Sequence, residues 1–550
     1  MKRFILILLA CAGACLALSG CSAKDQPAQQ SQTNAAQIEG TAIVLSDAGI
    51  TVDGEAISSD AAAAVYAASD IVYYEEGKDF TYGEGSEEDT HSAEEAAAHT
   101  VVHITRPGTY VLSGKLSRGQ VAVDLGKDAK EDPDAVVTLV LNGVEVHCSV
   151  APAVIFYNVY ECGSDDAETA AKDVDTSAAG ANVLIAEGTV NDIYGSYVAR
   201  IYQPESVVLS ADGTEVEEAK KLHKYDAAFY SKMSMNVGAW GDGEATLNIN
   251  AENEGLDSEL HLTINGGVIN ITSGNDGINT NEDGVSVTTV NGGVLNIVVN
   301  GATGEGDGID SNGWLVINGG TVTASACGFS ADSGIDSDMG IHVSGGTVIA
   351  SGNMLDRLEE GQNHAVFTFA QSQKGGSIYT LKNADGEAVA EYTPANDFSV
   401  LVVSAPELTA GEYTFWQGET QLAAASGMGG GFGGFGGMMP MPGGERPEGM
   451  KSPMGMEPPE GLEMPDGAVP PAPPEGMELP QRGEGGRGEF TMHEDGTMTL
   501  PDGAVAAPSQ MPQPGGFGGR DWQGGEVGEL STMFTITNGA NYFSAVAPAQ

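Results

Sequence analysis

Hydrophobic and polar residues alternate in short stretches that recur at a fixed period between Glu254 and Gly352. Four Gly-Gly pairs mark the period, and their first glycines lie 26, 27 and 26 residues apart. Each pair follows an Asn or a Ser and precedes a strand-like run: the pairs are Gly266-Gly267, Gly292-Gly293, Gly319-Gly320 and Gly345-Gly346. Short strands with glycine corners and no helical periodicity favour a β-solenoid.

The alternation also assigns side chains to two faces of each strand, because neighbouring side chains of a strand point in opposite directions. The positions two and four before each glycine pair are predicted to face inward: Ile264 and Leu262, Val290 and Thr288, Ile317 and Leu315, Val343 and Ile341. One outward column is predicted to contain His261, Val287, Trp314 and Gly340. The inward residues should form one aliphatic stack that neighbouring repeats share.

A second motif, Asp-Gly-Ile-Asp or a variant of it, precedes each glycine pair and carries most of the acidic residues. Equivalent residues should stack about 4.8 Å apart, the distance between paired strands. The motif then gives three polar columns: Glu254, Asp276, Asp307 and Ser333; Asp257, Asn279, Asp310 and Asp336; Glu259, Asn281, Asn312 and Asp338. A column of hydroxyl groups lies between the last two: Ser258, Thr280, Ser311 and Ser337.

The acidic columns predict bound cations. Two carboxylates at this spacing repel by roughly 3 to 4 kcal/mol at an effective dielectric constant of 20. From Met233 to Asp356 the sequence has sixteen Asp and Glu residues and no Lys or Arg. Oxygen ligands of this kind suit Ca²⁺, and we predict its ligands among Glu254, Asp257, Asp276, Asn279, Asp307, Asp310, Asp336 and Asp338. The alternative is a solvated edge, because Asp, Asn and Gly are common turn residues.

The N-terminus resembles a bacterial lipoprotein signal. Met1-Lys-Arg precedes an apolar run, Phe4 to Ala17, that is too short to span a bilayer and ends in Leu-Ser-Gly-Cys21. By this resemblance residues 1–20 are removed, Cys21 is lipidated, and residues 21–40 form a tether. We expect a monomer anchored by lipid on the extracellular face of the bacterial cell membrane. An ordinary secretory signal is the alternative.

The net charge limits the possible partners, and the cysteine positions suggest a possible disulfide. The formal net charge of -54 argues against a nucleic-acid partner and against anionic lipid as a partner without a cation. Outside the cell, Cys148 and Cys162 could form a disulfide, whereas Cys327 is expected to be a buried thiol within a repeat.

Several stretches, in this order, carry a resemblance to a known family: Ile104-Thr-Arg-Pro-Gly-Thr-Tyr-Val-Leu-Ser-Gly, Leu139-Val-Leu-Asn-Gly, Ala227-Ala-Phe-Tyr-Ser-Lys, and the Asp-Gly-Ile and Asn-Gly-Gly repeats. Over about residues 100–425 the chain resembles the bacterial carbohydrate-binding domain family of secreted right-handed parallel β-helices, typified by a clostridial protein that binds cellulose and acidic sugars. The resemblance implies a β-helix related to polysaccharide lyases, bound calcium, and sugar binding without demonstrated catalysis.

The predicted organisation is a β-helix domain over residues 41–425, with irregular N-terminal coils and regular coils at about 243–352. Residues 426–525 are rich in Gly, Pro and Met, and we expect this segment to be disordered because it has few large apolar side chains to offset the entropy of ordering. Residues 526–550 are predicted to return to the domain as strands.

Polysaccharide binding without cleavage is the predicted function. A lyase needs a base such as Lys or Arg, and the nearest ones, Lys232 and Arg357, flank the repeats. Asp307 and Asp310 could serve a hydrolase, but its other sequence elements are missing. A structural spacer or adhesin is a third possibility. Trp240 and Trp314 are the candidates for stacking on sugar rings, and packing beneath a loop is the alternative for both.

Overall fold

The computed structural model describes residues 39–241, 243–359, 361–427 and 528–546, and the backbone of three two-residue strands, β34 (Thr491–Met492), β35 (Met498–Thr499) and β36 (Val505–Ala506). In the described residues, strands dominate, and the helical elements are short: α1 (Ala93–Ala97), η1 (Glu87–Asp89), η2 (Ala129–Glu131) and η3 (Pro204–Ser206). The prediction of an all-β fold is confirmed. None of these helices has the length and hydropathy of a membrane span. Several predictions concern residues outside the described ones: the signal peptide, the lipidation of Cys21, most of the predicted tether, and most of residues 426–525.

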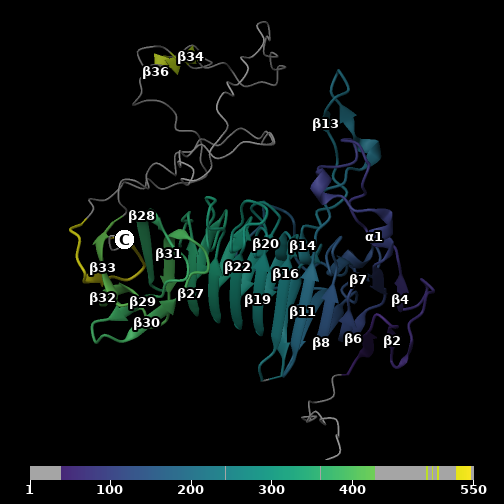
Figure 1. Ribbon diagram of the computed structural model, residues 1–550, viewed down its shortest axis with the longest axis horizontal. Helices are drawn as coiled ribbons and strands as arrows, with labels where there is room; N and C mark the ends of the chain where they lie inside the picture. The colour runs from purple at the N-terminus through teal and green to yellow at the C-terminus, as the bar shows by residue number, and fades with distance from the viewer. Residues whose placement is uncertain are drawn as a thin grey trace, which may run out of the picture.

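Strands far apart in the sequence stack side by side, in order, along the long axis of the molecule (Figure 1). One column is the eight-stranded sheet of β4 (Val65–Ala68), β5 (Thr100–Ile104), β7 (Gly119–Asp124), β9 (Val154–Asn158), β14 (Ala227–Ser231), β17 (Glu254–Ser258), β20 (Ile278–Thr280) and β23 (Ile309–Ser311). From β5 onward all pairs in this column are parallel, and β4 closes it with an antiparallel pair.

Two further parallel columns belong to the large sheet. The second consists of β10 (Ala181–Ala186), β15 (Met235–Trp240), β18 (His261–Ile264), β21 (Val287–Val290), β24 (Trp314–Ile317) and β26 (Gly340–Val343). The third consists of β11 (Val190–Gly195), β16 (Thr246–Ala251), β19 (Val268–Ser273), β22 (Val294–Val299), β25 (Thr321–Ser325) and β27 (Thr347–Gly352). Each regular repeat therefore contributes a strand to the second and third columns, and most contribute one to the first.

The predicted core is confirmed. Every residue predicted to face inward from the second column is at most 1% exposed. Burial of each aliphatic side chain contributes about 1.5 to 3 kcal/mol. Thr288 breaks the aliphatic pattern, and its hydroxyl lies 3.0 Å from that of Thr280, which in turn lies 2.9 Å from the hydroxyl of Ser311. The polar residue is thus satisfied inside the stack.

The glycine pairs stack along one edge between the second and third columns. Gly293, Gly320 and Gly346 have φ values of +90°, +83° and +79°. A Cβ on any of them would lie 2.6 to 2.7 Å from the carbonyl oxygen of the second glycine in the preceding pair. Only glycine satisfies both constraints, so each corner depends on the corner before it.

The outward column differs from its prediction. His261 and Val287 are 2% and 1% exposed, because the long loop between β9 and β10 crosses this face. A Cβ on Gly163 of that loop would lie 2.6 Å from the ring of His261, and the Nδ1 atom of His261 accepts the Val287 N–H at 3.1 Å. Outward positions become buried wherever this loop covers them.

The two ends of the stack are closed by antiparallel strands. At the N-terminal end β1 (Thr41–Leu45) pairs parallel with β6 (Gly108–Leu116) and antiparallel with β2 (Thr51–Val52), which pairs with β3 (Glu55–Ala56). At the other end β31 (Phe398–Ser404) pairs antiparallel with β27. Between the ends, β8 (Val137–His147) pairs with β6, β10 and β11 without a corner. A small hairpin, β12 (Val208–Leu209) and β13 (Val216–Glu218), stands away from the stack.

The C-terminal strands form a second, more aromatic core, in which Phe367 stacks on Phe415 with ring centroids 3.9 Å apart. Its remaining strands are β28 (His364–Gln373), β29 (Tyr379–Asn383), β30 (Ala388–Tyr392), β32 (Gly411–Gln417), β33 (Thr420–Ser426), β37 (Phe534–Ile536) and β38 (Ala540–Val546). The strand β38 lies between β28 and β33. Cys148, Cys162 and Cys327 are all free, so the suggested Cys148–Cys162 disulfide is absent, and Cys327 is buried.

Candidate functional site

The predicted acidic columns come together along the first column of strands. β17, β20 and β23 pair in a register that aligns Asp257 with Asn279 and Asn279 with Asp310. The backbone N–H of Asp338 donates to the Ser311 carbonyl at 3.1 Å, as that of Asn312 does to Thr280 at 3.0 Å. Asp336 therefore continues the Asp310 column into the next repeat.

Several polar atoms in these columns are buried without a partner. Asn281 donates to Oδ1 of Asp257 at 2.6 Å, and Asn279 donates to Oε1 of Glu254 at 3.3 Å. The other side-chain oxygens of these residues, Glu254 Oε2, Asp257 Oδ2 and Asn279 Oδ1, find no hydrogen-bond partner, and neither does Asp336 Oδ1. Glu254, Asp257 and Asn279 are 6%, 0% and 7% exposed. A buried polar atom without a partner costs about 1 to 3 kcal/mol.

The middle of the columns uses backbone donors instead. Asp276 accepts the N–H of Asp307 at 2.7 Å, and Asp307 accepts the N–H of Ser333 at 2.5 Å. These bonds link one repeat to the next, and they favour ionised carboxylates. Asp338 at the end of the third polar column is exposed to solvent.

Burial raises the pKa of the carboxyl groups of Glu254, Asp257, Asp276, Asp307, Asp310, Asp336 and Asp338, and repulsion from neighbouring carboxylates raises it further. Burial, followed by repulsion from Asp310, raises the pKa of Asp276 to about 8, and burial, followed by repulsion from Asp356, does the same for Asp336. The pKa of Asp310 rises to about 6, with burial again the larger cause. Glu254, Asp257 and Asp307 have pKa values well above the ordinary range for the same two reasons. Without a counter-charge, the columns hold protons near neutral pH.

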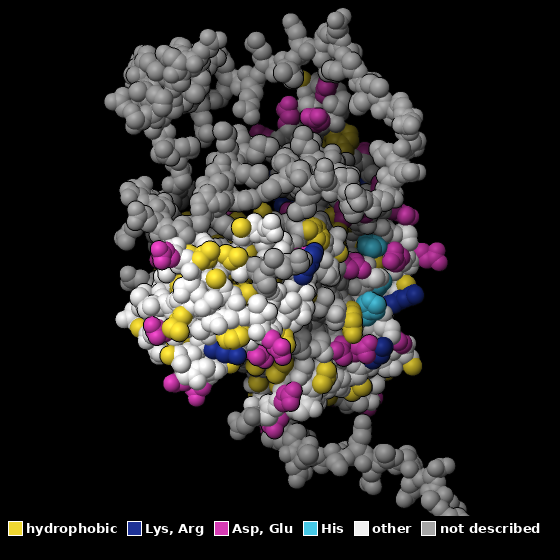
Figure 2. Space-filling view, turned by 60° about the vertical axis from the view of Figure 1, so that its left-hand side comes forward, with side chains coloured by type: hydrophobic (Ala, Val, Ile, Leu, Met, Phe, Trp, Pro, Cys, Tyr) yellow, Lys and Arg dark blue, Asp and Glu magenta, His cyan; other side chains and the backbone are white. Residues whose placement is uncertain are grey.

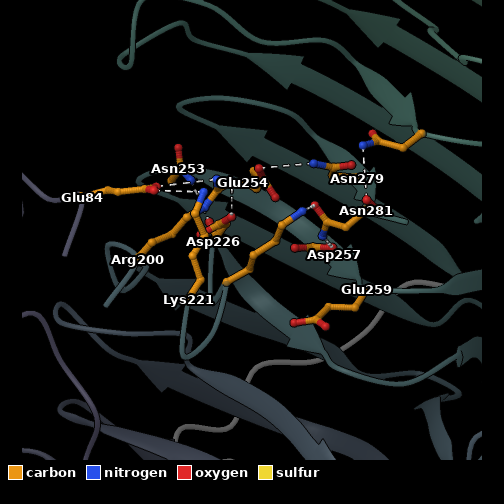
Figure 3. A network of polar contacts seen from close by, with 12 residues as sticks. Glu84, Arg200, Lys221, Asp226, Asn253, Glu254, Asp257, Glu259, Asn279 and Asn281 are labelled. Atoms are coloured by element: carbon orange, nitrogen blue, oxygen red, sulfur yellow. Dashed lines mark hydrogen bonds and ion pairs between the residues drawn. The ribbon is translucent and has the colours of Figure 1, made fainter. Parts of the chain in front are cut away.

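Among the described residues, several basic side chains lie beside the first part of the columns. Figure 3 shows Arg200 and Lys221 beside Glu84 and Asp226, next to Glu254 and Asp257. The Nζ atom of Lys224 lies 3.3 Å from Oδ1 of Asn281, and Arg200 lies 3.7 Å from Asp226. These contacts could not be predicted from the sequence, because the segment that carries the basic residues precedes the repeats and is irregular.

Farther along, Arg357 is the next basic residue; burial raises the pKa of Asp356 above its ordinary value, and Arg357 offsets part of that rise. The side chains of Asp276, Asp307 and Asp310 have no Lys or Arg among the groups that shift their pKa values. On the face drawn in Figure 2, acidic side chains are spread among uncharged ones and basic side chains are few. Within the part of the chain that the structure describes, no Lys or Arg side chain forms an ion pair with the acids in the middle of the columns.

The donor set of the columns fits a hard cation. Within the described residues, no three Asp, Glu, His or Cys side chains converge on one point as ligands. A cation would therefore take one or two carboxylates together with amide, hydroxyl or carbonyl oxygens, which is a mixture that Ca²⁺ accepts. The unpartnered oxygens of Glu254, Asp257 and Asn279 are of this kind, so the residues present fit Ca²⁺.

The two candidate tryptophans lie on the second column of strands. Trp240 ends β15 and is 41% exposed. It follows Asn236 and Gly238 at alternate positions, and it therefore lies on the outward face of that strand. Trp314 begins β24 and is half-buried, and it shares the outward column of the buried His261 and Val287. Of the two, Trp240 is the more accessible to a ligand.

Comparison with known proteins identifies the chain. A solved structure of a polysaccharide lyase-like protein from C. thermocellum, a gadolinium derivative, is similar at 18% identity and a TM-score of 0.34, and the alignment covers 59% of this chain and 95% of that one. That likeness is too low to bear on function. No curated protein matches. A family model described as carbohydrate-binding domain-containing protein matches residues 98–386, which is more than half of the chain. The chain therefore belongs to this carbohydrate-binding domain-containing family.

Proposed function

We propose that the protein binds polysaccharide at the bacterial cell surface, where a lipid on Cys21 anchors it, and that it does not cleave its ligand. The match of residues 98–386 to a carbohydrate-binding family carries this proposal. The net charge of -54 supports a ligand that is not a nucleic acid. We expect a monomer, with residues 41–425 as the binding domain, residues 426–525 as a disordered insertion and residues 526–550 as returning strands.

The proposed architecture of the binding domain is a right-handed parallel β-helix. Three parallel columns with aligned registers support this winding, because each regular repeat passes through them in the same order before the next repeat begins. Crossover connections between parallel strands are almost always right-handed. An experimental structure with left-handed or unclosed coils would contradict the proposal.

Calcium is the proposed counter-ion of the acidic columns. Glu254, Asp257 and Asn279 would hold one ion with their unpartnered buried oxygens, and Asp276, Asp307, Asp310, Asp336 and Asp338 are the candidates for further ions. A bound ion would supply positive charge to carboxylates that otherwise repel one another. A polyuronate ligand would need the same positive charge to approach this surface.

The single most informative experiment is retention of the full-length protein on a glycan array, with and without a chelator. We expect neutral or acidic glycans to retain the protein, and acidic glycans to do so only with calcium. If no glycan retains the protein in the presence of calcium, a structural spacer or adhesin becomes the better account.

One observation favours a second candidate function, the lyase reaction. Lys224 lies beside Asn281 and acts on the carboxylate of Asp257 in β17, and Arg200 lies beside Asp226, so a basic side chain is present where the sequence alone placed none. Prolonged incubation with polygalacturonate at several calcium concentrations separates the two functions. Unsaturated ends that form with the native protein and are lost in Lys224→Ala would establish the lyase, and intact polymer supports binding alone.

A further inference from the structure

A groove with a volume of about 870 Å³ lies over the outer face of the second column of strands. Its floor crosses β10, β15, β18, β21 and β24, and one wall is the segment 172–177 of the loop that also covers His261. The acidic columns belong to different strands, those of the first column. The groove is therefore a separate feature of the same repeats.

The floor of the groove is uncharged and regular. Register pairing aligns one outward row along it: Asn182, Asn236, Thr263, Thr289 and Val316. The second outward row begins with Leu184 and Gly238 and continues into the asparagines that precede the glycine corners. Among the described residues that line the groove, the charged ones are Lys172, Asp173 and Asp175, and all three belong to the wall.

The wall is fixed to the floor by hydrogen bonds. The hydroxyl of Thr176 lies 2.8 Å from Oδ1 of Asn236 and 2.7 Å from the hydroxyl of Thr263. The amide of Asn236 donates to the Thr176 carbonyl at 2.8 Å. Thr176 and Thr263 are 5% and 6% exposed. The groove is thus formed before any ligand binds, and a preformed site loses less entropy on binding.

A ladder of amides forms the far edge of the floor. Asn291 donates to Asn265 at 2.9 Å and Asn318 donates to Asn291 at 3.0 Å. All three side chains are exposed. A primary amide has two N–H donors and two acceptor lone pairs, so each rung keeps a donor and an acceptor for a ligand. These free groups repeat every strand, about 4.8 Å apart.

We propose that this groove binds an unbranched, neutral glycan that runs along the strand columns, and that it does so without a metal ion. The amide ladder would hydrogen-bond its hydroxyl groups, and Leu184 would contact the apolar face of a sugar ring. The inference rests on the proposed function and adds the site and the class of ligand.

Charge decides between neutral and acidic glycans. The one lysine of the wall, Lys172, is 2.6 Å from Asp173 and is already paired, and Asp175 adds a further negative charge. A polyuronate would meet net negative charge here and throughout the surface. Trp240 is 41% exposed, lies on the same face of β15 as Asn236 and Gly238, and precedes Gly241, which lines the groove.

The first test fills the groove. A Cβ at Gly238 would meet only Asn265 Cβ and Leu184 Cδ2, both at 3.7 Å, so a side chain fits there without strain. Calorimetric titration of the full-length protein with cellohexaose, xylohexaose and mannohexaose, all in EDTA, should show binding of at least one of them. Gly238→Leu should weaken that binding roughly tenfold or more, with an unchanged melting temperature.

The second test uses a matched pair of substitutions in two amide ladders. Asn296 donates to Asn270 at 2.8 Å in the third column, much as Asn291 does to Asn265, but it does not line the groove. Asn291→Asp should weaken hexasaccharide binding about tenfold, and Asn296→Asp should leave it unchanged. Equal effects of the two substitutions would overturn the assignment of the groove.

The outcomes also separate this inference from the proposed function. If the native protein binds a glycan but Gly238→Leu and Asn291→Asp bind it equally well, the groove is not the site and the binding function stands. If glycans bind only in the presence of calcium, the metal-free site is wrong. If no glycan binds with or without calcium, both proposals fail together.

Discussion

The amide ladders and the acidic columns are built by the same parallel register, in the same repeats, with opposite results. In the third column of strands, Asn296 donates to Asn270 and Asn270 donates to Asn248, both at 2.8 Å. In the first column, Glu254 and Asp257 keep buried oxygens without partners. An amide both donates and accepts, so identical neighbours satisfy each other, whereas a carboxylate only accepts. A stack of amides therefore satisfies its own hydrogen bonds, whereas a stack of carboxylates needs an added cation or proton.

Removal of calcium should have the largest effect on the free energy of unfolding, and it tests the difference between the acidic columns and the amide ladders. A ligand that binds only the folded protein at 100 to 1,000 times its dissociation constant stabilises it by about 2.7 to 4.1 kcal/mol. We expect calcium to raise the free energy of unfolding by this amount over EDTA, as measured by urea titration. Asn296→Ala, in an amide ladder, should show the same calcium increment. An unchanged unfolding curve, with no metal found by elemental analysis, would leave the columns as protonated or solvated edges.

The next largest effect is a pH dependence that appears only in chelator. The folded pKa of Asp276 and of Asp336 is about 8, above the ordinary value of 3.8, so the folded protein holds extra protons between these values. The stability that these two protonated carboxyl groups contribute is therefore fully present below about pH 4, and it is lost as the pH rises through about 8. One extra proton gives a slope of about 1.4 kcal/mol per pH unit.

The window from pH 6.5 to 8 isolates the carboxyl groups. The buried His223 and His261, with pKa values lowered to about 4 by desolvation, change stability only below their ordinary value of 6.5. We expect the free energy of unfolding in EDTA to fall by roughly 3 kcal/mol across this window, because Asp276 and Asp336 both release protons there. A flat or rising profile would mean that the carboxylates are ionised without calcium.

A smaller effect comes from converting a carboxylate into an amide. Asp257→Asn keeps an acceptor for Asn281 and gives the unpartnered side a donor beside other carboxylates. In EDTA at pH 8 this variant should be about 1 to 2 kcal/mol more stable than the native protein, and its calcium increment should shrink. Glu217→Gln, at an exposed position of the hairpin strand β13 away from the columns, is the control and should change neither quantity. Destabilisation of Asp257→Asn in EDTA would contradict the contrast drawn here.

The smallest effect is the loss of one rung of an amide ladder. Asn270→Ala removes the bonds to Asn248 and Asn296 at the surface, and it should cost about 1 kcal/mol with or without calcium. Chemical denaturation in the two conditions measures it. A calcium-dependent cost would show that the ladders and the acidic columns are energetically coupled.

The periodicity of the sequence predicted the features that recur in each repeat, but it did not predict the irregular loop that packs across several repeats. The inward residues, the stacked glycine corners and the alignment of Asp257, Asn279 and Asp310 follow from strand alternation and period alone. The burial of His261 depends on a long irregular loop, which has no period to place it. The same loop supplies the wall of the groove.

The candidate site was predictable to a similar degree. Its acids could be identified from the motif, but Lys224 and Arg200 could not, because their segment precedes the repeats and only the fold brings it to β17. The free Cys148 and Cys162 make the same point, since the suggestion of a disulfide rested on composition and compartment. The period of the sequence predicts which residues share a column. It does not predict which irregular segments cover that column.

The antiparallel strands at the two ends of the stack limit how the protein can assemble. A parallel column presents unpaired N–H and C=O groups at each end, and a second molecule could add to them as one repeat adds to the next. The reversed strands β4 and β31 occupy such edges at opposite ends. These strands cover the ends of the stack, so a second molecule cannot extend it there. A chain that ended before β31 would expose the edge of β27 as a template on which further molecules could add into fibres.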